Sequence, residues 1–265
     1  MSYEIIDFHT HPFTDPDSNI CNYKENSGMS IDDTKGYLQG LGIHRICGSV
    51  ICRNRPQETI YETPWDAISE SNRRALMLRD TYGDFYIPGI HVHPDYVQQS
   101  CEEIQRMSRL GIRLIGELVP YMHDWSNYTC KAFDEILDTA SQFHMVINFH
   151  PSQDEDAMDT MVKRHPNTVF VAAHPGEHPK YMRHLQRMEF SENYHLDLSG
   201  TGLFRHRMLR YGIDRCGAHR FLFGSDYPTC NPAMFIGGVL LDPLITPQEK
   251  DLIFSKNAKR LLDVE

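Results

Sequence analysis

The chain has 265 residues, of which 40% are hydrophobic and 23% charged, and its formal net charge at pH 7 is −10. This length suits a single large domain, and the composition is typical of a globular protein with a sizeable core. The negative charge disfavours a general affinity for nucleic acid or for an anionic membrane surface. We therefore expect neither of these as a partner.

Cysteine usage and the apolar stretches point to the cytoplasm. The seven cysteines are odd in number and scattered, and no CxxC occurs. This pattern is typical of reduced thiols and not of a disulfide framework. Glu4 and Asp7 lie where a signal peptide would need apolar residues, and the longest apolar stretches are too short to span a bilayer.

Eight short apolar or β-branched runs recur along the chain, starting near residues 4, 44, 85, 112, 145, 168, 194 and 220. Each gap between them can hold a loop and a helix. Apolar strands that alternate with helices indicate a parallel sheet buried on both faces. Eight such units predict an α/β fold, a single-domain (β/α)8 TIM barrel over residues 1–265. An open doubly wound sheet is the alternative, but no glycine-rich phosphate loop follows the first run.

Helical patterns fill the gaps between these runs. A capping-box-like pair, Ser30 and Asp33, predicts a helix start, and Gly42 predicts its end. Amphipathic periodicity predicts helices over 95–111, 131–143 and 155–165. The final segment, 246–265, has a proline suited to a first helical turn and apolar residues at helical spacing.

The motif HxH occurs twice, as His9 and His11 after the first run and as His91 and His93 after the third. Fifteen histidines produce roughly 0.8 such pairs by chance, so position has to decide. Residues two apart in a strand face the same side, and barrel enzymes keep their active sites at the carboxyl ends of the strands. Two imidazoles presented together suit a divalent metal. Asp7 lies on the same predicted face as a supporting group.

Other predicted strands end in metal-ligand residues as well. Taken singly, each could be a buried paired carboxylate or a hydrogen-bonded loop histidine, but together they predict a metal site with His9 and His11. The four additional candidates are Glu117, His150, His174 and Asp226. This set leaves no ligand position for His91 and His93, for which we expect a substrate-pocket or structural role.

The loops after the predicted strands carry candidate substrate contacts. Arginines suit a carboxylate or phosphate, and aromatic residues suit a flat or sugar-like body. The alternative is that the arginines are solvated and the aromatic residues pack locally, and both interpretations stay open. The loop over 14–29 is long enough to form a lid. The candidate substrate residues are Arg53, Arg55, His93, Tyr121, His123 and Arg205, with Trp125 and Tyr128 nearby in sequence.

The ordered motifs DFHTHP, NFHPS, AAHPGE, LFGSDYP and NAKRLL resemble the amidohydrolase superfamily, in particular its amidohydrolase-related hydrolases and decarboxylases. The resemblance runs from residue 5 to about residue 262. It implies a (β/α)8 barrel with one or two divalent metal ions, with zinc as the first expectation and manganese as the alternative. Many members carry a carboxylated lysine at the end of the fourth strand, where this chain has Glu117.

The resemblance implies a ligand set for each ion. His9, His11 and Asp226 would hold the first ion. His150 and His174 would hold the second, with Glu117 as the bridge. A glutamate bridge also occurs in TatD-type deoxyribonucleases, but GELVP lacks their extended pattern and the chain is acidic.

The implied activity is hydrolysis of an ester, lactone or amide of a small molecule by hydroxide generated at the metal centre, with Asp226 as the proton acceptor. The alternative is one-metal decarboxylation of an unsaturated or aromatic acid. In that case His174 would contact the substrate, and Glu117 would be a supporting or acid–base group. A TatD-type nuclease and a non-catalytic metal-binding barrel rank lower. A homo-oligomer is compatible with the sequence.

Overall fold

The computed structural model describes residues 3–15, 18–21, 30–54, 59–202 and 205–265. Eight strands form one sheet in the order β1 to β8, and every neighbouring pair is parallel. The strands are β1 (Ile5–Thr10), β2 (Ile43–Ser49), β3 (Tyr86–Ile90), β4 (Leu114–Leu118), β5 (Val146–Phe149), β6 (Val169–Ala172), β7 (Tyr194–Asp197) and β8 (Phe221–Leu222).

Backbone hydrogen bonds close the sheet between its first and last strands. The amide of Phe8 donates to the carbonyl of Phe223 at 2.9 Å, and the amide of Asp226 donates to the carbonyl of His9 at 2.8 Å. A parallel bridge between Thr10 and Tyr227 continues the contact beyond β8. The predicted (β/α)8 barrel is therefore confirmed, with a short eighth strand that is prolonged by these bonds.

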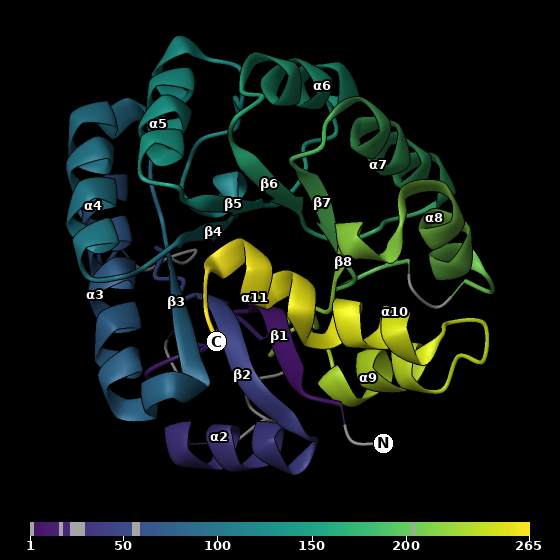
Figure 1. Cartoon of the computed structure of the whole chain (residues 1–265). Helices are drawn as coiled ribbons and strands as arrows, with labels where there is room; N and C mark the ends of the chain where they lie inside the picture. Colours follow the sequence, from purple (N-terminus) through teal and green to yellow (C-terminus); the bar gives the residue numbers. More distant parts are fainter. Residues whose placement is uncertain (1–2, 16–17, 22–29, 55–58, 203–204) are drawn as a thin grey trace.

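Helices surround the strands as an outer ring (Figure 1). They are α2 (Ile31–Gly40), α3 (Pro64–Tyr82), α4 (Val97–Arg109), α5 (Lys131–Gln142), α6 (Glu155–Arg164), α7 (His178–Phe190), α8 (Met208–Cys216), α9 (Pro232–Leu240), α10 (Pro247–Asp251) and α11 (Asn257–Leu262). The capping box of Ser30 and Asp33 forms as predicted. A π-helical turn, Leu252–Lys256, joins α10 to α11, so the single C-terminal helix expected from the sequence is irregular in its middle.

Two apolar clusters build the interior. The larger one packs strand residues such as Phe149 and Phe170 against helix residues such as Phe133 and Leu185. Burial of each such side chain contributes about 1.5–3 kcal/mol. The smaller cluster joins strand residues to Ala258 and Leu262 of α11, and it consists of Ile6, Phe8, Cys47, Leu114, Val146, Val171, Leu222, Ala258 and Leu262.

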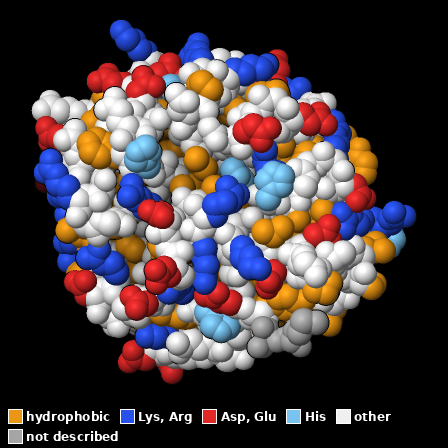
Figure 2. Space-filling view, in the orientation of Figure 1, with side chains coloured by type: hydrophobic (Ala, Val, Ile, Leu, Met, Phe, Trp, Pro, Cys, Tyr) orange, Lys and Arg blue, Asp and Glu red, His pale blue; other side chains and the backbone are white. Residues whose placement is uncertain are grey.

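The smaller cluster shows which end of the barrel is closed. Lys259 of α11 pairs with Glu4, just before β1, at 2.6 Å. Figure 1 shows α11 crossing in front of the strands at this amino end. Basic and acidic side chains are interspersed with apolar ones over the same face (Figure 2). The carboxyl ends of the strands therefore remain available for a functional site. None of the helices among the described residues is long and apolar enough to cross a membrane.

Candidate metal centre

The six predicted ligand residues converge at the carboxyl end of the barrel. His9 and His11 are buried on and directly after β1, and Glu117 is buried on β4. The other three come from the loops that follow β5, β6 and β8, and they are partly exposed: His150, His174 and Asp226. The site is therefore buried on the side of β1 and β4 and partly open to solvent on the side of the three loops.

Glu117 lies at the centre of this group and contacts all four histidines. Its Oε2 atom is 3.1 Å from Nε2 of His11 and 3.3 Å from Nε2 of His9. Its Oε1 atom is 3.1 Å from Nδ1 of His150 and 3.6 Å from Nε2 of His174. Each oxygen of one carboxylate thus faces a different pair of histidines.

Asp226 completes the side of the site next to β1. Its Oδ1 atom is 3.8 Å from Nε2 of both His9 and His11. Among the described residues, two groups of donor atoms lie close enough together to hold a metal ion. One is His9, His11 and Asp226, and the other is His9, Glu117 and His174. His150 belongs to neither group and contacts Glu117.

A second layer of contacts orients three of the imidazoles. Nδ1 of His9 is 2.9 Å from Oδ2 of Asp197, and Nδ1 of His11 is 3.2 Å from the carbonyl oxygen of Ser49. Nδ1 of His174 is 3.0 Å from the hydroxyl of Ser199. These contacts hold the outer nitrogens and direct each Nε2 towards the centre, as is usual for metal-ligating histidines.

The donor set fits a divalent cation. The Ser49 carbonyl can only accept a hydrogen bond, so Nδ1 of His11 carries the hydrogen and Nε2 of the neutral ring has a lone pair. This Nε2 atom lies 3.1 Å from Oε2 of Glu117. Two acceptors at this distance need a proton or a metal ion between them. Histidine and carboxylate ligands of this kind suit zinc and related metals.

The electrostatics of the centre also favour positive charge. Burial opposes a charged His9, but Asp197 and Glu117 outweigh burial and hold the pKa of His9 well above its usual value. Burial likewise opposes an ionised Glu117, but His9, His11 and His150 hold its pKa well below the usual value. A site that keeps a carboxylate ionised and attracts protons would exchange those protons for a metal ion.

Backbone geometry explains how two of the loop residues turn back into the site. His174 and Asp226 both have left-handed backbone angles, each with φ of 64°. Such angles are uncommon outside glycine and occur often at functional sites. A Cβ atom on Gly200 would lie 2.3 Å from Nδ1 of His174, so the SGTG loop after β7 needs glycine where it passes this ring.

Asp197 is the functional residue that the sequence analysis missed. It ends β7, is fully buried, and accepts hydrogen bonds from Asn148 at 3.2 Å and from the backbone amide of His174 at 3.3 Å. The sequence feature that could have identified Asp197 is a carboxylate at the end of a predicted strand, which is the feature that identified Glu117. Asp7, expected as a supporting group, accepts from the amide of His9 at 3.3 Å and from the amide of Ser225 at 2.9 Å, and it ties β1 to the loop that carries Asp226.

Of the three arginines predicted to contact the substrate, the two that the structure describes lie in different places. Arg53 is partly buried close to His123, whose pKa is lowered to about 3 by burial and, to a smaller degree, by His93 and Arg53. Arg205 pairs with Glu177 and lines a separate cleft beside α7 and α8. Arg55 lies outside the described residues, as do residues 16–17 and 22–29 of the predicted lid.

The second HxH pair belongs to neither metal-ligand group. His93 is buried, and its Nδ1 accepts from the amide of Asp95 at 3.0 Å while Nε2 lies 2.8 Å from the carbonyl of His123. Both ring nitrogens of His93 therefore contact backbone atoms, which supports a structural role over a role in the substrate pocket. His91 packs on His123 with ring centroids 4.6 Å apart. Among the described residues, the two buried ring nitrogens of His123 have no hydrogen-bond partner.

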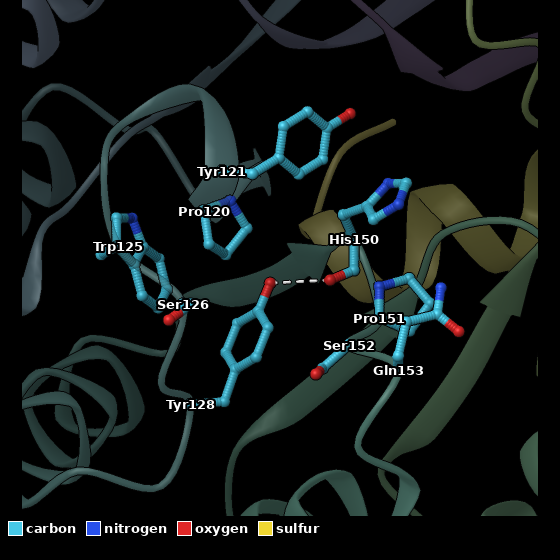
Figure 3. Close-up of a pocket in the computed structure, with 9 residues that line it drawn as sticks. All are labelled: Pro120, Tyr121, Trp125, Ser126, Tyr128, His150, Pro151, Ser152 and Gln153. Carbon is cyan, nitrogen blue, oxygen red and sulfur yellow. Dashed lines mark hydrogen bonds between the residues drawn. The ribbon is translucent and has the colours of Figure 1, made fainter.

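A cleft opens beside the metal centre between the loops that follow β4 and β5. Figure 3 shows the rings of Tyr121 and His150 at one end and the side chains of Ser152 and Gln153 at the other. Trp125 and Tyr128 form part of its wall. The Tyr121 and His150 rings meet edge to face with centroids 5.6 Å apart. Tyr121 thus adjoins the candidate metal centre, whereas His123 is buried and does not line this cleft. The substrate roles expected of both residues stay predictions.

Three similar solved structures share the fold at low sequence identity. The 2,6-dihydroxybenzoate decarboxylase from Rhizobium has a TM-score of 0.72 and 20% identity, over 98% of this chain and 99% of that one. The 5-carboxyvanillate decarboxylase from Sphingomonas paucimobilis has a TM-score of 0.70 and 14% identity, over 100% of both chains. A dihydroxybenzoic acid decarboxylase from Polaromonas sp. JS666, with bound manganese and the inhibitor 2-nitroresorcinol, has a TM-score of 0.69 and 15% identity, over 98% and 97%.

The comparison with protein families covers almost the whole chain. No curated protein matches the sequence significantly. The family model described as amidohydrolase matches residues 6–264. The chain therefore belongs to the amidohydrolase family, whose enzymes use a divalent metal ion.

Proposed function

We propose that this protein is a metal-dependent hydrolase that acts on an ester, lactone or amide of a small molecule. The observation that carries the proposal is the position of Glu117, whose two carboxylate oxygens face two different histidine pairs. This is the arrangement expected of a carboxylate that bridges two metal ions. Two-metal sites of this type are common in hydrolytic enzymes.

The residues divide between two positions. His9, His11 and Asp226 would hold one ion, and His150 and His174 the other, with zinc as the expected metal. Bound ions would supply Lewis-acid activation of water and of the scissile carbonyl group. Asp226 is partly exposed at the mouth of the site. It would accept the proton of the attacking water and pass it to the leaving group.

The substitution Glu117→Gln tests the bridge. We expect wild type to bind two ions per chain and Glu117→Gln to bind one, because an amide is a poor bridging ligand. Metal content after loading with zinc, and separately with manganese, is measured by atomic emission. Glu102→Gln, at an exposed position on α4, is the matched control and should keep two ions. Equal metal content in all three proteins would remove the bridging role.

Activity is measured on the same metal-loaded samples with panels of esters, lactones and amides. We expect turnover of at least one class by wild type and by Glu102→Gln, with a loss of at least about 100-fold in Glu117→Gln, since removing a metal ligand removes several kcal/mol of transition-state stabilisation. Wild-type protein that holds two ions and hydrolyses no member of these panels would contradict the hydrolase proposal.

Decarboxylation of an aromatic or unsaturated acid is the second candidate. Its specific support is that both metal-ligand groups contain His9. Because Nδ1 of His9 contacts Asp197, only its Nε2 is directed to the centre, and that one nitrogen would bind one ion. The three similar structures described above are of decarboxylases. In this case one ion would bind, His174 would contact the substrate, and Glu117 would act in proton transfer. Release of carbon dioxide from dihydroxybenzoates by a one-metal protein would favour this candidate over hydrolysis.

A further inference from the structure

We propose that the cleft beside His150 is a specificity site for a flat, uncharged part of the substrate that carries a neutral hydrogen-bonding group. The cleft has a volume of about 250 Å³ and lies between the loops that follow β4 and β5 (Figure 3). The inference rests on the proposed function only in placing the reacting part of the substrate at the metal centre. It holds for either of the two candidate reactions.

The aromatic wall of the cleft is held in place before any ligand binds. Tyr128 is buried and its hydroxyl donates to the carbonyl of His150 at 2.7 Å. Trp125 is 8% exposed and packs against Tyr128 and Phe133, each with ring centroids 5.1 Å apart. Tyr121, by contrast, is 63% exposed at the end next to His150. A preformed aromatic wall with one open ring edge suits a planar ligand at a low entropic cost.

The cleft is continuous with the metal centre through His150. This residue lines the cleft, and its Nδ1 is 3.1 Å from Glu117. The Tyr121 ring at the same end of the cleft meets the His150 ring edge to face, with centroids 5.6 Å apart. A molecule with its reacting group at the metal centre would extend past His150 into this cleft.

The lining of the cleft selects for neutral groups. The described residues that line it include no lysine, arginine, aspartate or glutamate, and the side chains of Ser126, Ser152 and Gln153 supply its polarity. Ser152 accepts from the amide of Asp154 at 3.1 Å and keeps its hydroxyl hydrogen available to a ligand. A charged group would lose hydration here without gaining a charged partner from these lining side chains, and the nearby Lys180 ammonium already donates to the Pro151 carbonyl at 3.4 Å. A hydroxyl or carboxamide could pair with the serines and the glutamine.

Tryptophan fluorescence measures ligand binding in the cleft without any turnover. The chain has two tryptophans, and in a Trp65→Phe background the emission reports Trp125 alone. The probe is benzamide, which is flat and neutral, titrated into the metal-loaded protein. We expect saturable quenching. Tyr121→Ala should weaken binding about five- to tenfold, because an aromatic contact is lost.

Two further variants supply the controls. Tyr211→Ala removes a tyrosine of similar exposure, 48%, from the separate cleft beside α8 and should leave benzamide binding unchanged. Gln153→Glu should weaken benzamide and strengthen the cationic isostere benzamidine, a reversal that general unfolding would not produce. Quenching that Tyr121→Ala leaves unaltered, or an equal loss in Tyr211→Ala, would overturn the proposal.

Glu117→Gln separates the cleft from the proposed reaction. This variant should lose a metal ion and activity but bind benzamide as the wild type does. Normal binding by a protein that hydrolyses and decarboxylates nothing would contradict the proposed function and leave the cleft supported. Absence of saturable benzamide binding by an active wild-type enzyme would contradict the cleft proposal alone.

Discussion

Asp197 shows how a residue that would touch no metal ion can control the centre. Its carboxylate lies 2.9 Å from Nδ1 of His9 and accepts a further bond from the hydroxyl of Ser199, which itself lies 3.0 Å from Nδ1 of His174. A single buried carboxylate thus orients two of the predicted ligands. Outer contacts of this kind also raise the basicity of the ligating nitrogen.

We predict that Asp197→Asn weakens zinc binding about 10- to 100-fold, because the negative charge behind His9 is lost while the shape is kept. Competition with a chromogenic chelator measures the affinity. Glu192→Gln removes a carboxylate that is 92% exposed and paired with Arg220, and it should bind zinc as the wild type does. An unchanged affinity in Asp197→Asn would show that packing alone orients His9.

At the scale of single elements, α11 packs at the end of the barrel opposite the candidate metal centre. Ala258 and Leu262 close the amino end of the barrel, while all six ligand candidates lie at or near the carboxyl ends of strands. TIM barrels commonly divide in this way, with stability at one end and chemistry at the other.

Leu262→Ala should therefore destabilise the protein without altering the metal centre. Leu262 is 1% exposed, and its truncation leaves a cavity that costs about 2–5 kcal/mol in the free energy of unfolding. Urea denaturation measures this change. Leu241→Ala, at a position 77% exposed, should stay within about 0.5 kcal/mol of wild type. A fall in zinc content in folded Leu262→Ala protein would contradict the separation of the two ends.

At the scale of the whole molecule, buried neutral histidines make the fold sensitive to acid. Burial, with Arg220 and Arg260 adding to it, lowers the pKa of His195 on β7 to about 3. Burial and Arg187 likewise lower the pKa of His184 on α7 well below its usual value. In the unfolded chain both would titrate near about 6.5. The unfolded state therefore binds more protons below that pH, and stability falls from there towards pH 3.

We predict that His195 alone removes about 2.3 kcal/mol of stability between pH 6.5 and pH 4.5, since a pH unit corresponds to about 1.4 kcal/mol for one proton and the unfolded-state imidazole is already half protonated at pH 6.5. His195→Gln should reduce the loss of unfolding free energy over this range by that amount. Urea denaturation at both pH values measures it. His144→Gln controls for the substitution at an exposed position. Equal acid sensitivity in wild type and His195→Gln would exclude His195 as a cause.

Local sequence patterns determined the barrel and the positions of the candidate ligands. The apolar runs and capping signals are properties of short windows, which is why all eight strands and the start of α2 were predictable. His9, Glu117 and Asp226 were found because a strand end places a side chain at the carboxyl face whatever its neighbours are. The contacts among these residues were not predictable in the same way.

The pairing of side chains depended on closure of the barrel. His9 meets Asp197 from 188 positions away, and Glu117 meets His11 from 106 positions away. Spacing and periodicity carry no information about contacts over such separations, because they depend on strand register and loop path. For the same reason the sequence could not show that His93 binds backbone, that Arg205 lies at a separate cleft, or that Glu117 divides its oxygens between two histidine pairs. Barrel closure brings these distant residues together.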